Sequence, residues 1–468
     1  MLFTSLHFFI FFAVVLIGLR LLRHNEHKIT WLMLAGAFFY GYWDWKFLAL
    51  LGFTSIFDFY LGLRIGAAQG ALRKRLLILD IIVNLGILCV FKYLNFFIDS
   101  ANAVLPVAAH LPVLRVLLPI GISFFVFEAM SYCIDIYRGT LEPYKNWRHF
   151  AVFIFFFPRL IAGPIIRPAD FLPQLQREIR ITRPNFILGG QMFLMGMTKK
   201  LVIADRLSSY VDLVFAHPEQ YSGASIWQAV IAYSIQIFCD FSGYSDMALG
   251  LAKILGFDLP VNFRMPYIAA SLTDFWRRWH ISLSSWLRDY LYIPLGGNRK
   301  GVTRTYVNLL ITMTLGGLWH GASWNFVIWG VLHGLGLALH KAFSTMRANW
   351  RWKGDDIVTR IVSWAVTYLF VCLCWVFFRA QSFGDAITCL LKMANVLQGG
   401  LTWLCGPLLV ILPAVILAHA IGLSLQSRQS PPMLNLNRFS HLVFLFCWIM
   451  GIFFLAATVS APFIYFQF

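Results

Sequence analysis

The stretch Leu315–Gly330, LGGLWHGASWNFVIWG, indicates the fold of the chain, because it has the apolar and aromatic character of a segment inside a bilayer. It nevertheless carries an ionisable ring, His320, between a Gly-Gly pair and a Gly-Ala-Ser sequence. Small residues on both sides predict a broken or tightly packed helix with the ring at the break. His320 is therefore a candidate for chemistry, although a membrane histidine can also serve as a hydrogen-bond bridge between helices.

The composition of the whole chain is typical of a membrane protein. The 468 residues are 59% hydrophobic and 17% aromatic, and only 13% are charged. We predict an all-α polytopic membrane protein with about 11 transmembrane helices of roughly 20 residues each, plus re-entrant and interfacial helices. The net charge of +17 falls mainly in loops, which the positive-inside bias explains without a nucleic acid partner.

No internal repeat or soluble insertion divides the sequence, so we expect a single membrane domain over residues 1–468. We expect N-terminal helices over 1–138, a catalytic core with re-entrant pieces over 139–343, and C-terminal helices over 344–468. The N-terminal apolar run has no basic region before it and no small-residue cleavage signal after it. It therefore predicts a retained first span rather than a removed signal peptide.

Loop charges predict the topology. The loops Arg20–Lys28 and Ala71–Arg75 are basic, as is the segment 347–353, whereas Asp99–Pro112 contains no Lys or Arg. Because basic loops remain in the cytoplasm, both termini are expected on the outer side. The apolar inner segment Val152–Pro168 is broken by three prolines and a glycine, which predicts a backbone that is covered by protein or lines a water-filled funnel open to the cytoplasm.

Two carboxylates, Asp240 and Asp246, interrupt the apolar segment FCDFSGYSD. Carboxylates at membrane depth are costly unless they are paired or face water. Arg264, Arg277 and Arg278 are the expected ion-pair partners, and both aspartates can be structural anchors rather than functional groups.

The following segment, FWRRWHISLSSWLRDYLYIPL, has apolar residues at roughly helical spacing. An interfacial amphipathic helix explains its tryptophans but not a histidine after two arginines. On a continuous helix His280 lies one turn after Trp276 and on the same face as Ser284. His333, between small residues in WGVLHGLG, is expected to be structural.

The eight cysteines show no CxxC pair and no spacing with histidine that is typical of zinc ligands, so no metal site or redox motif is predicted. Most of them lie in apolar runs, where a thiol behaves as a small hydrophobic group. Cys389 and Cys405 can share an outer loop, and a disulfide between them is left open.

Three long motifs carry a resemblance to a known family: Cys239–Ala252, Leu272–Gly301 and Leu315–Gly334. Together they resemble the membrane-bound O-acyltransferases, and in particular the branch that acetylates exopolysaccharides such as alginate. The resemblance covers nearly the whole chain, and Cys239 is a local departure without catalytic weight. It implies a helical fold around a tunnel from the cytoplasm, with His320 as the essential histidine and His280 as the second site residue.

The resemblance also implies an activity in the bacterial inner membrane. Acetyl-CoA is the expected co-substrate, and no bound cofactor or metal is expected. The expected partners are a periplasmic SGNH-type acetyltransferase and the polysaccharide biosynthesis machinery. His320 would act as general base, because the imidazole pKa of about 6.5 suits proton transfer near neutral pH. An acetyl-enzyme on Ser323 is disfavoured, because no base is paired with that hydroxyl in the sequence.

Other residues are assigned to the donor. Trp276 and Ser284 are expected to help bind it. Cations near the funnel are expected to attract its phosphates. These cations are Arg277, Arg278, Arg299, Lys300 and Arg304. For Arg299, Lys300 and Arg304 the alternative is a solvated inner face.

Three other functions remain open. The first is D-alanyl transfer from a carrier protein, within the same family. The second is a proton-coupled transporter or flippase that uses His320, Asp240 and Asp246 as a relay, which the lack of repeats disfavours. The third is a scaffold that only docks the periplasmic enzyme.

Overall fold

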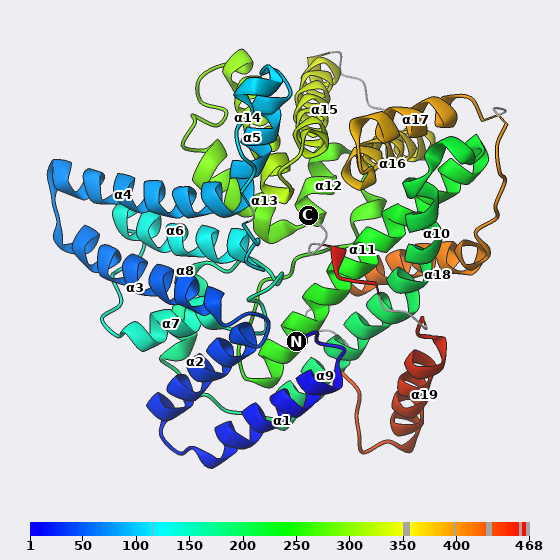
Figure 1. The fold of residues 1–468 in the computed structure, drawn as a ribbon. Helices are drawn as coiled ribbons and strands as arrows, with labels where there is room; N and C mark the ends of the chain where they lie inside the picture. Colours follow the sequence, from blue (N-terminus) through cyan, green and yellow to red (C-terminus); the bar gives the residue numbers. More distant parts are fainter. Residues whose placement is uncertain (115, 350–355, 397–398, 427–432, 458–460, 465–468) are drawn as a thin grey trace. The chain divides into compact units, whose positions relative to one another are not determined.

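The computed structural model of the protein describes residues 1–114, 116–349, 356–396, 399–426, 433–457 and 461–464 (Figure 1). The basic residues expected on the inner side over 350–353, and the C-terminal residues 465–468, lie outside the described residues. Within them the fold is helical and the sole β interaction is an isolated bridge between Tyr221 and Leu401. The predicted all-α class is confirmed.

Among the described residues, six helical stretches are long and apolar enough to cross a membrane, by length and composition. They are Lys46–Ala67, Gly70–Asn102, Arg183–Ala216, Trp324–Arg347, Ile357–Arg379 and Gly406–Leu425, and two shorter apolar helices are Leu6–Leu21 and Phe439–Leu455. This number is smaller than the 11 or so spans expected from hydropathy. Other apolar segments fold into shorter helices, such as the nine-residue helix Trp147–Phe155.

The chain forms two compact units. The first unit comprises Met1–Phe193 and Ser245–Pro260, and the second comprises Leu194–Tyr244 and Val261–Phe468. Helices α9 (Arg183–Met197) and α11 (Gly223–Ile254) contribute residues to both. The single membrane domain over residues 1–468, and its segment boundaries at 138 and 343, stay predictions.

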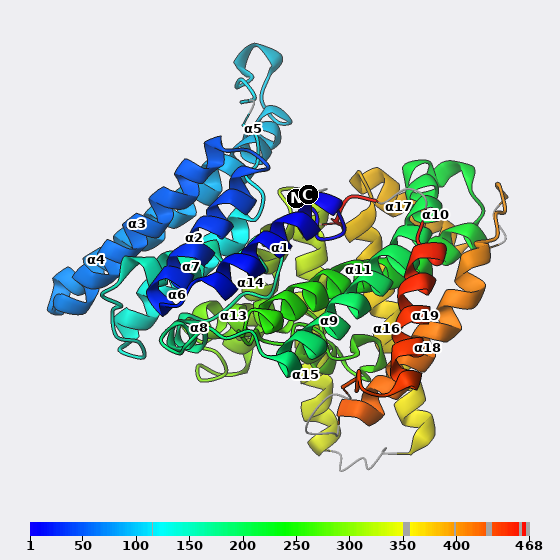
Figure 2. The ribbon, with the colours of Figure 1, turned by 90° about the horizontal axis from the view of Figure 1, so that it is seen from below.

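The first unit is built from eight helices that lie within it, together with parts of α9 and α11. They are α1 (Leu6–Leu21), α2 (Asn25–Gly41), α3 (Lys46–Ala67), α4 (Gly70–Leu88), α5 (Leu94–Asn102), α6 (Ile122–Arg138), α7 (Trp147–Phe155) and α8 (Pro168–Leu175). Helix α6 packs against both α3 and α4, and these helices lie side by side in Figures 1 and 2. Almost every residue of α6 is buried, which makes it the centre of this unit.

The proline-broken segment after α7 is covered by protein. Residues 156–166 are buried although they are not helical. Arg159 and Glu128 form a buried ion pair, and Glu128 Oε1 also accepts a hydrogen bond from the backbone of Ile166 at 3.0 Å. The first of the two predicted environments, cover by protein, is thereby confirmed. Side chains form hydrogen bonds with backbone groups that are not paired within a helix. The funnel stays a prediction.

The second unit contains the remaining helices. They are α10 (Asp205–Ala216), α12 (Leu272–Arg278), α13 (Ile281–Leu287), α14 (Val302–His320), α15 (Trp324–Asn349), α16 (Ile357–Arg379), α17 (Phe383–Ala394), α18 (Gly406–Gln426) and α19 (Phe439–Leu455). Helices α14 and α15 form a closely packed pair, and α15 also packs against α16. Three fully buried tryptophans fill the interior of this unit: Trp279, Trp329 and Trp375.

Candidate functional site

His320 is the last residue of α14, and its ring is 4% exposed. Gly321 follows with an extended backbone, and α15 begins at Trp324. The two helices approach closely, because a Cβ atom on Gly317 would collide with the carbonyl oxygen of Phe326. The sequence prediction of a break and of tight packing around this histidine is confirmed, and glycine permits both.

His280 also lies at a helix break, and here the prediction of a continuous helix is wrong. Helix α12 ends at Arg278, α13 begins at Ile281, and His280 between them has a left-handed backbone with φ of 43°. The incoming extended segment stabilises the break: the carbonyl of Asn262 accepts a hydrogen bond from Ile281 N at 2.9 Å. Asn262 Oδ1 accepts a second one from the hydroxyl of Ser282, also at 2.9 Å. The helical phase expected between Trp276 and His280 is therefore interrupted, whereas Ser284 N still donates to the His280 carbonyl at 2.9 Å.

The two breaks bring the two histidines together. The ring centroids of His280 and His320 are 6.1 Å apart, although 40 positions separate the residues in the sequence. Trp319 contacts both rings, with centroid distances of 5.9 Å and 5.1 Å. Phe241 packs edge-on against His280 at 4.6 Å, and Trp329 packs against His320 at 5.1 Å. The pair thus lies in an aromatic environment from which water is largely excluded.

Burial determines the protonation state of His280, which lies outside the six candidate spans. Its ring is completely buried, and desolvation lowers its pKa to about 3. The imidazole is therefore neutral near pH 7, with one nitrogen as donor and the other as acceptor. It can orient a substrate or accept a proton, but it does not supply a fixed positive charge.

A cavity of about 710 Å³ opens in the second unit between α12, α13, α14 and α15. Three of the four residues proposed to bind the donor line it: Trp276, Arg277 and Ser284. Neither His280 nor His320 is a lining residue. The cavity approaches them through aromatic rings, because Trp276 lies 5.7 Å from Trp329, which packs against His320.

Several lining residues were not expected from the sequence. Arg288 and Tyr292 lie on a π-helical turn, Arg288–Tyr292, and α15 adds His340 and Lys341. Lys341 Nζ donates to Asn298 Oδ1 at 2.8 Å. The only sequence signal for His340 and Lys341 is a basic pair at the end of an apolar helix, and such a pattern indicates a binding site only weakly. Their approach to α13 depends on the α14 and α15 pairing.

The other proposed donor-binding cations lie elsewhere. Arg278 does not line the cavity; its Nε lies 2.9 Å from Asp274, and its NH1 donates to the carbonyl of Arg264. Three further cations are exposed on the surface and do not line it either: Arg299, Lys300 and Arg304. Arg277 is therefore the member of the predicted set that faces the cavity.

Asp240 has a different partner from those expected. Its Oδ1 lies 2.8 Å from Nζ of Lys200, which also lies 2.7 Å from Asp205. Arg278 pairs with Asp274 instead. The structural-anchor interpretation of Asp240 is supported, because all three members of this network are buried. Lys200 belongs to a π-helical segment, Thr198–Ala204, whose extra residue per turn turns its side chain toward α11.

The remaining candidates are structural. His333 is completely buried, and its Nδ1 accepts a hydrogen bond from Trp276 Nε1 at 3.3 Å, so it supports a cavity residue. Cys389 and Cys405 are both free and buried, so the open alternative of a disulfide is not realised. Asp246 is partly buried in α11.

Comparison with known proteins agrees with this architecture. A family model of the membrane-bound O-acyltransferases matches residues 109–383, which include both histidines. The chain is 44% identical over 386 residues to the probable alginate O-acetylase AlgI of Pseudomonas putida, covering 82% of this chain and 78% of that protein. It is 37% identical over 424 residues to the peptidoglycan O-acetyltransferase of Helicobacter pylori, covering 84% and 79%. The teichoic acid D-alanyltransferase of Bacillus subtilis is more distant, at 27% identity over 277 residues, or 56% of this chain and 69% of that protein.

Proposed function

Since the chain belongs to the membrane-bound O-acyltransferase family and is a multi-pass membrane protein, we propose a specific acetyl transfer for it. The protein takes an acetyl group from acetyl-CoA on the cytoplasmic side of a bacterial inner membrane. The acetyl group then passes outward for O-acetylation of an exopolysaccharide such as alginate. The observation that carries this proposal is the 6.1 Å approach of His280 and His320 in a buried aromatic environment, close to a cavity with cationic lining residues. Two histidines placed at helix breaks offer a proton acceptor inside an apolar interior, where ionisable residues often mark functional sites.

His320 is the general base in this proposal. Its imidazole takes the proton of the acceptor hydroxyl as the hydroxyl oxygen attacks the thioester carbonyl. The carbon–sulfur bond breaks, the coenzyme leaves as a thiolate, and the proton returns from His320 to the sulfur. The products are an O-acetyl ester and free coenzyme A, so atoms and charges balance. No covalent intermediate on the protein is required.

His280 is the second site residue. Because its ring is neutral and fully buried, it can hold one hydrogen-bonding group of the donor or acceptor in place. An N–H aimed at the thioester oxygen would also stabilise the charge that develops there during attack. Either role depends on position rather than on protonation near neutral pH.

The cavity supplies the donor site. Arg277, Arg288 and Lys341 offer positive charge for the phosphates of the coenzyme. Trp276 and Ser284 also line the cavity, and Trp276 lies 5.7 Å from the buried Trp329. A volume of about 710 Å³ is within the range of small-molecule sites in proteins. The pantetheine arm would reach toward His320 once the Trp276 and Trp329 rings move apart.

The acceptor is the part of the reaction with two candidates. Relatives of comparable coverage are named an alginate O-acetylase and a peptidoglycan O-acetyltransferase, so a wall polysaccharide is the second candidate polymer. In both cases we propose that a periplasmic SGNH-type acetyltransferase receives the acetyl group first and passes it to sugar hydroxyls. D-alanyl transfer is less favoured, because the D-alanyltransferase relative shares only 27% identity over 56% of the chain.

The experiment that tests this proposal measures ester-bound acetate and D-alanine in the extracellular polysaccharide and in the cell wall. Cells would carry the wild type, His320→Gln, His280→Gln or His149→Gln, with membrane levels matched by immunoblot. His149 is a matched control, since it is a buried histidine in the first unit that pairs with Glu26. We expect His320→Gln to lower bound acetate by about 100-fold or more, since general base catalysis contributes roughly 10² to 10⁴ in rate.

The other outcomes separate the alternatives. If bound acetate is normal in His320→Gln at equal abundance, the remaining functions are a scaffold that docks the periplasmic enzyme and a transporter. Loss of D-alanine esters instead of acetate would assign the D-alanyl reaction. The polymer that loses acetate in His320→Gln identifies the final acceptor.

A further inference from the structure

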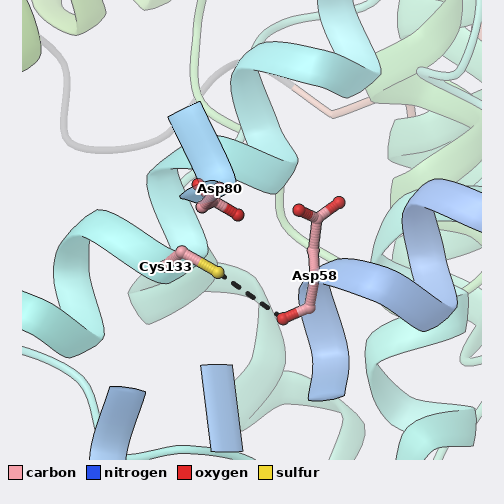
Figure 3. A group of neighbouring side chains, drawn as sticks. All are labelled: Asp58, Asp80 and Cys133. Atoms are coloured by element: carbon pink, nitrogen blue, oxygen red, sulfur yellow. Dashed lines mark hydrogen bonds between the residues drawn. The ribbon is translucent and has the colours of Figure 1, made fainter. Parts of the chain in front are cut away.

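Three side chains of types that bind metals meet inside the first unit. Asp58 comes from α3, Asp80 from α4 and Cys133 from α6, and one potential ligand atom of each lies within 4.8 Å of the others. Figure 3 shows the three side chains facing one another from three helices. No local motif indicates this cluster, because successive members lie 22 and 53 positions apart in the sequence.

The two carboxylates are buried without a positive partner. Asp58 and Asp80 are both 0% exposed and belong to two of the candidate spans. None of the ion pairs among the described residues includes either one. The two side chains hydrogen-bond to each other, and the Oδ2 atom of each accepts no hydrogen bond from another described group. Since a lone carboxylate in a membrane interior is costly, two adjacent ones require a neutralising group.

Neutral polar side chains around the two carboxyl groups also have atoms without hydrogen-bond partners. Asn84 is 0% exposed, and its Nδ2 donates to Asp58 Oδ1 at 2.7 Å and to the carbonyl of Asp80 at 3.1 Å. Its Oδ1 atom, equally buried, has no partner. Ser55, one turn before Asp58 on the same face of α3, is 0% exposed and its Oγ also has no partner. Leftover oxygen atoms beside two carboxylates suit a bound cation, because buried oxygens are otherwise hydrogen-bonded.

We propose that Asp58, Asp80 and Cys133 form a structural site for a divalent transition metal ion, with Zn²⁺ as the best match. Zinc accepts carboxylate oxygen and cysteine sulfur together, whereas Mg²⁺ and Ca²⁺ prefer oxygen alone. Tetrahedral zinc places oxygen and sulfur ligands about 3.6 Å apart, so small side-chain rotations close the observed cluster around the ion. Rotation of the Asn84 amide would offer its oxygen as a fourth ligand.

Binding would exchange protons for the metal. Cys133 Sγ donates to the carbonyl of Asp58 at 3.5 Å, as the dashed line in Figure 3 marks, so the thiol is protonated in this arrangement. Zinc takes the thiolate and both carboxylates, so the thiol proton and the proton shared by Asp58 and Asp80 are released to solvent. The site is therefore expected to bind zinc more weakly as the pH falls. The metal would join α3, α4 and α6, the helices at the centre of the first unit.

The test measures metal, not acetyl transfer, so its result is independent of the proposed function. The full-length chain would be purified in detergent from zinc-supplemented cells, and zinc would be counted by mass spectrometry. We expect about one zinc per wild-type chain, and at least a tenfold lower content in Asp80→Asn and Cys133→Ser. Asp99→Asn, an exposed carboxylate of α5, and Cys389→Ser, a buried free thiol of the second unit, are matched controls that should keep the metal.

A second measurement does not depend on the variants folding normally. Wild-type protein stripped with a chelator would be titrated with Co²⁺, whose bond to a thiolate gives a near-ultraviolet absorption band. A saturable band that Zn²⁺ abolishes supports the site. Absence of zinc in the purified wild type, together with no band on Co²⁺ addition, would overturn the proposal and leave a proton as the group that neutralises the two carboxylates.

Discussion

The carboxylate of Asp240 binds the backbone of Ile464: its Oδ2 accepts a hydrogen bond from the Ile464 amide at 2.7 Å. Lys200, the ion-pair partner of Asp240, donates to the carbonyl of Ala461 at 2.9 Å. Between these two contacts Phe463 stacks on Tyr244 with a centroid distance of 4.7 Å. The described end of the C-terminal segment is thereby fixed beside α11 by a buried charge network.

This network also reaches the candidate site. Phe463 lies 6.1 Å from Phe241, and Phe241 packs edge-on against His280 at 4.6 Å. The ion pair, the C-terminal segment and the histidine thus form one chain of contacts within the second unit. Changes at Lys200 or Asp240 should affect His280 without touching it.

Lys200→Met is predicted to destabilise the protein strongly. The change leaves Asp205 and Asp240 buried without their common counter-ion, and removal of one partner from a buried ion pair costs about 3 to 5 kcal/mol. Thermal unfolding of the purified protein in detergent would measure the loss. Lys145→Met, at an exposed lysine, should leave the midpoint unchanged. An unchanged midpoint in Lys200→Met would show that the network does not fix the segment.

Arg277→Ala is predicted to raise KM for the acetyl donor about tenfold while changing kcat little. Arg277 lines the cavity, and a charge-assisted hydrogen bond to a phosphate contributes about 1.5 to 3 kcal/mol before solvent screening. Initial rates at varied acetyl-CoA concentration would measure this. Arg299→Ala is the comparison, because Arg299 is an exposed cation that does not line the cavity. Equal KM values in the two variants would show that the donor phosphates do not bind at Arg277.

Gly317→Ala is predicted to lower both the stability and the activity of the protein. The added Cβ would collide with the carbonyl of Phe326 and separate α14 from α15 one turn before His320. Overpacking of this kind costs about 1 to 3 kcal/mol. Gly86→Ala in α4 is the control, since a Cβ there meets nothing within 4 Å. Membrane abundance and unfolding temperature should fall in Gly317→Ala and be retained in Gly86→Ala.

His280 is predicted to make stability depend on pH. Its folded-state pKa is about 3, below the ordinary value of 6.5, so below pH 6.5 the unfolded chain binds a proton that the folded chain does not. The stabilisation is therefore complete above pH 6.5 and is lost progressively as the pH falls toward 3. Unfolding midpoints at pH 7.5, 6 and 5 would follow this loss. His280→Gln should flatten the profile, whereas His110→Gln, at an exposed histidine, should not.

The sequence by itself determined the class of the fold and indicated His280 and His320 as candidate site residues. Long apolar stretches require helices in a bilayer, and small residues around His320 permit a break and a close approach, both of which are local properties. The motifs around His280 and His320 also determined the family, which the comparison confirmed. Against the 11 or so spans expected from hydropathy, the described residues contain six stretches that are long and apolar enough to cross a membrane, and two shorter apolar helices.

Only the tertiary structure decided how these residues meet. His280 has a left-handed backbone, and the next two residues, Ile281 and Ser282, donate hydrogen bonds to Asn262. Asn262 lies outside the helical pattern on which the sequence prediction rested. The partner of Asp240 is Lys200, 40 positions earlier, because a π-helical segment faces α11 in the fold. Likewise Asp58, Asp80 and Cys133 converge only because three helices pack together. Helical periodicity fixes which face a residue occupies, but contacts between distant segments depend on packing, which no local pattern encodes.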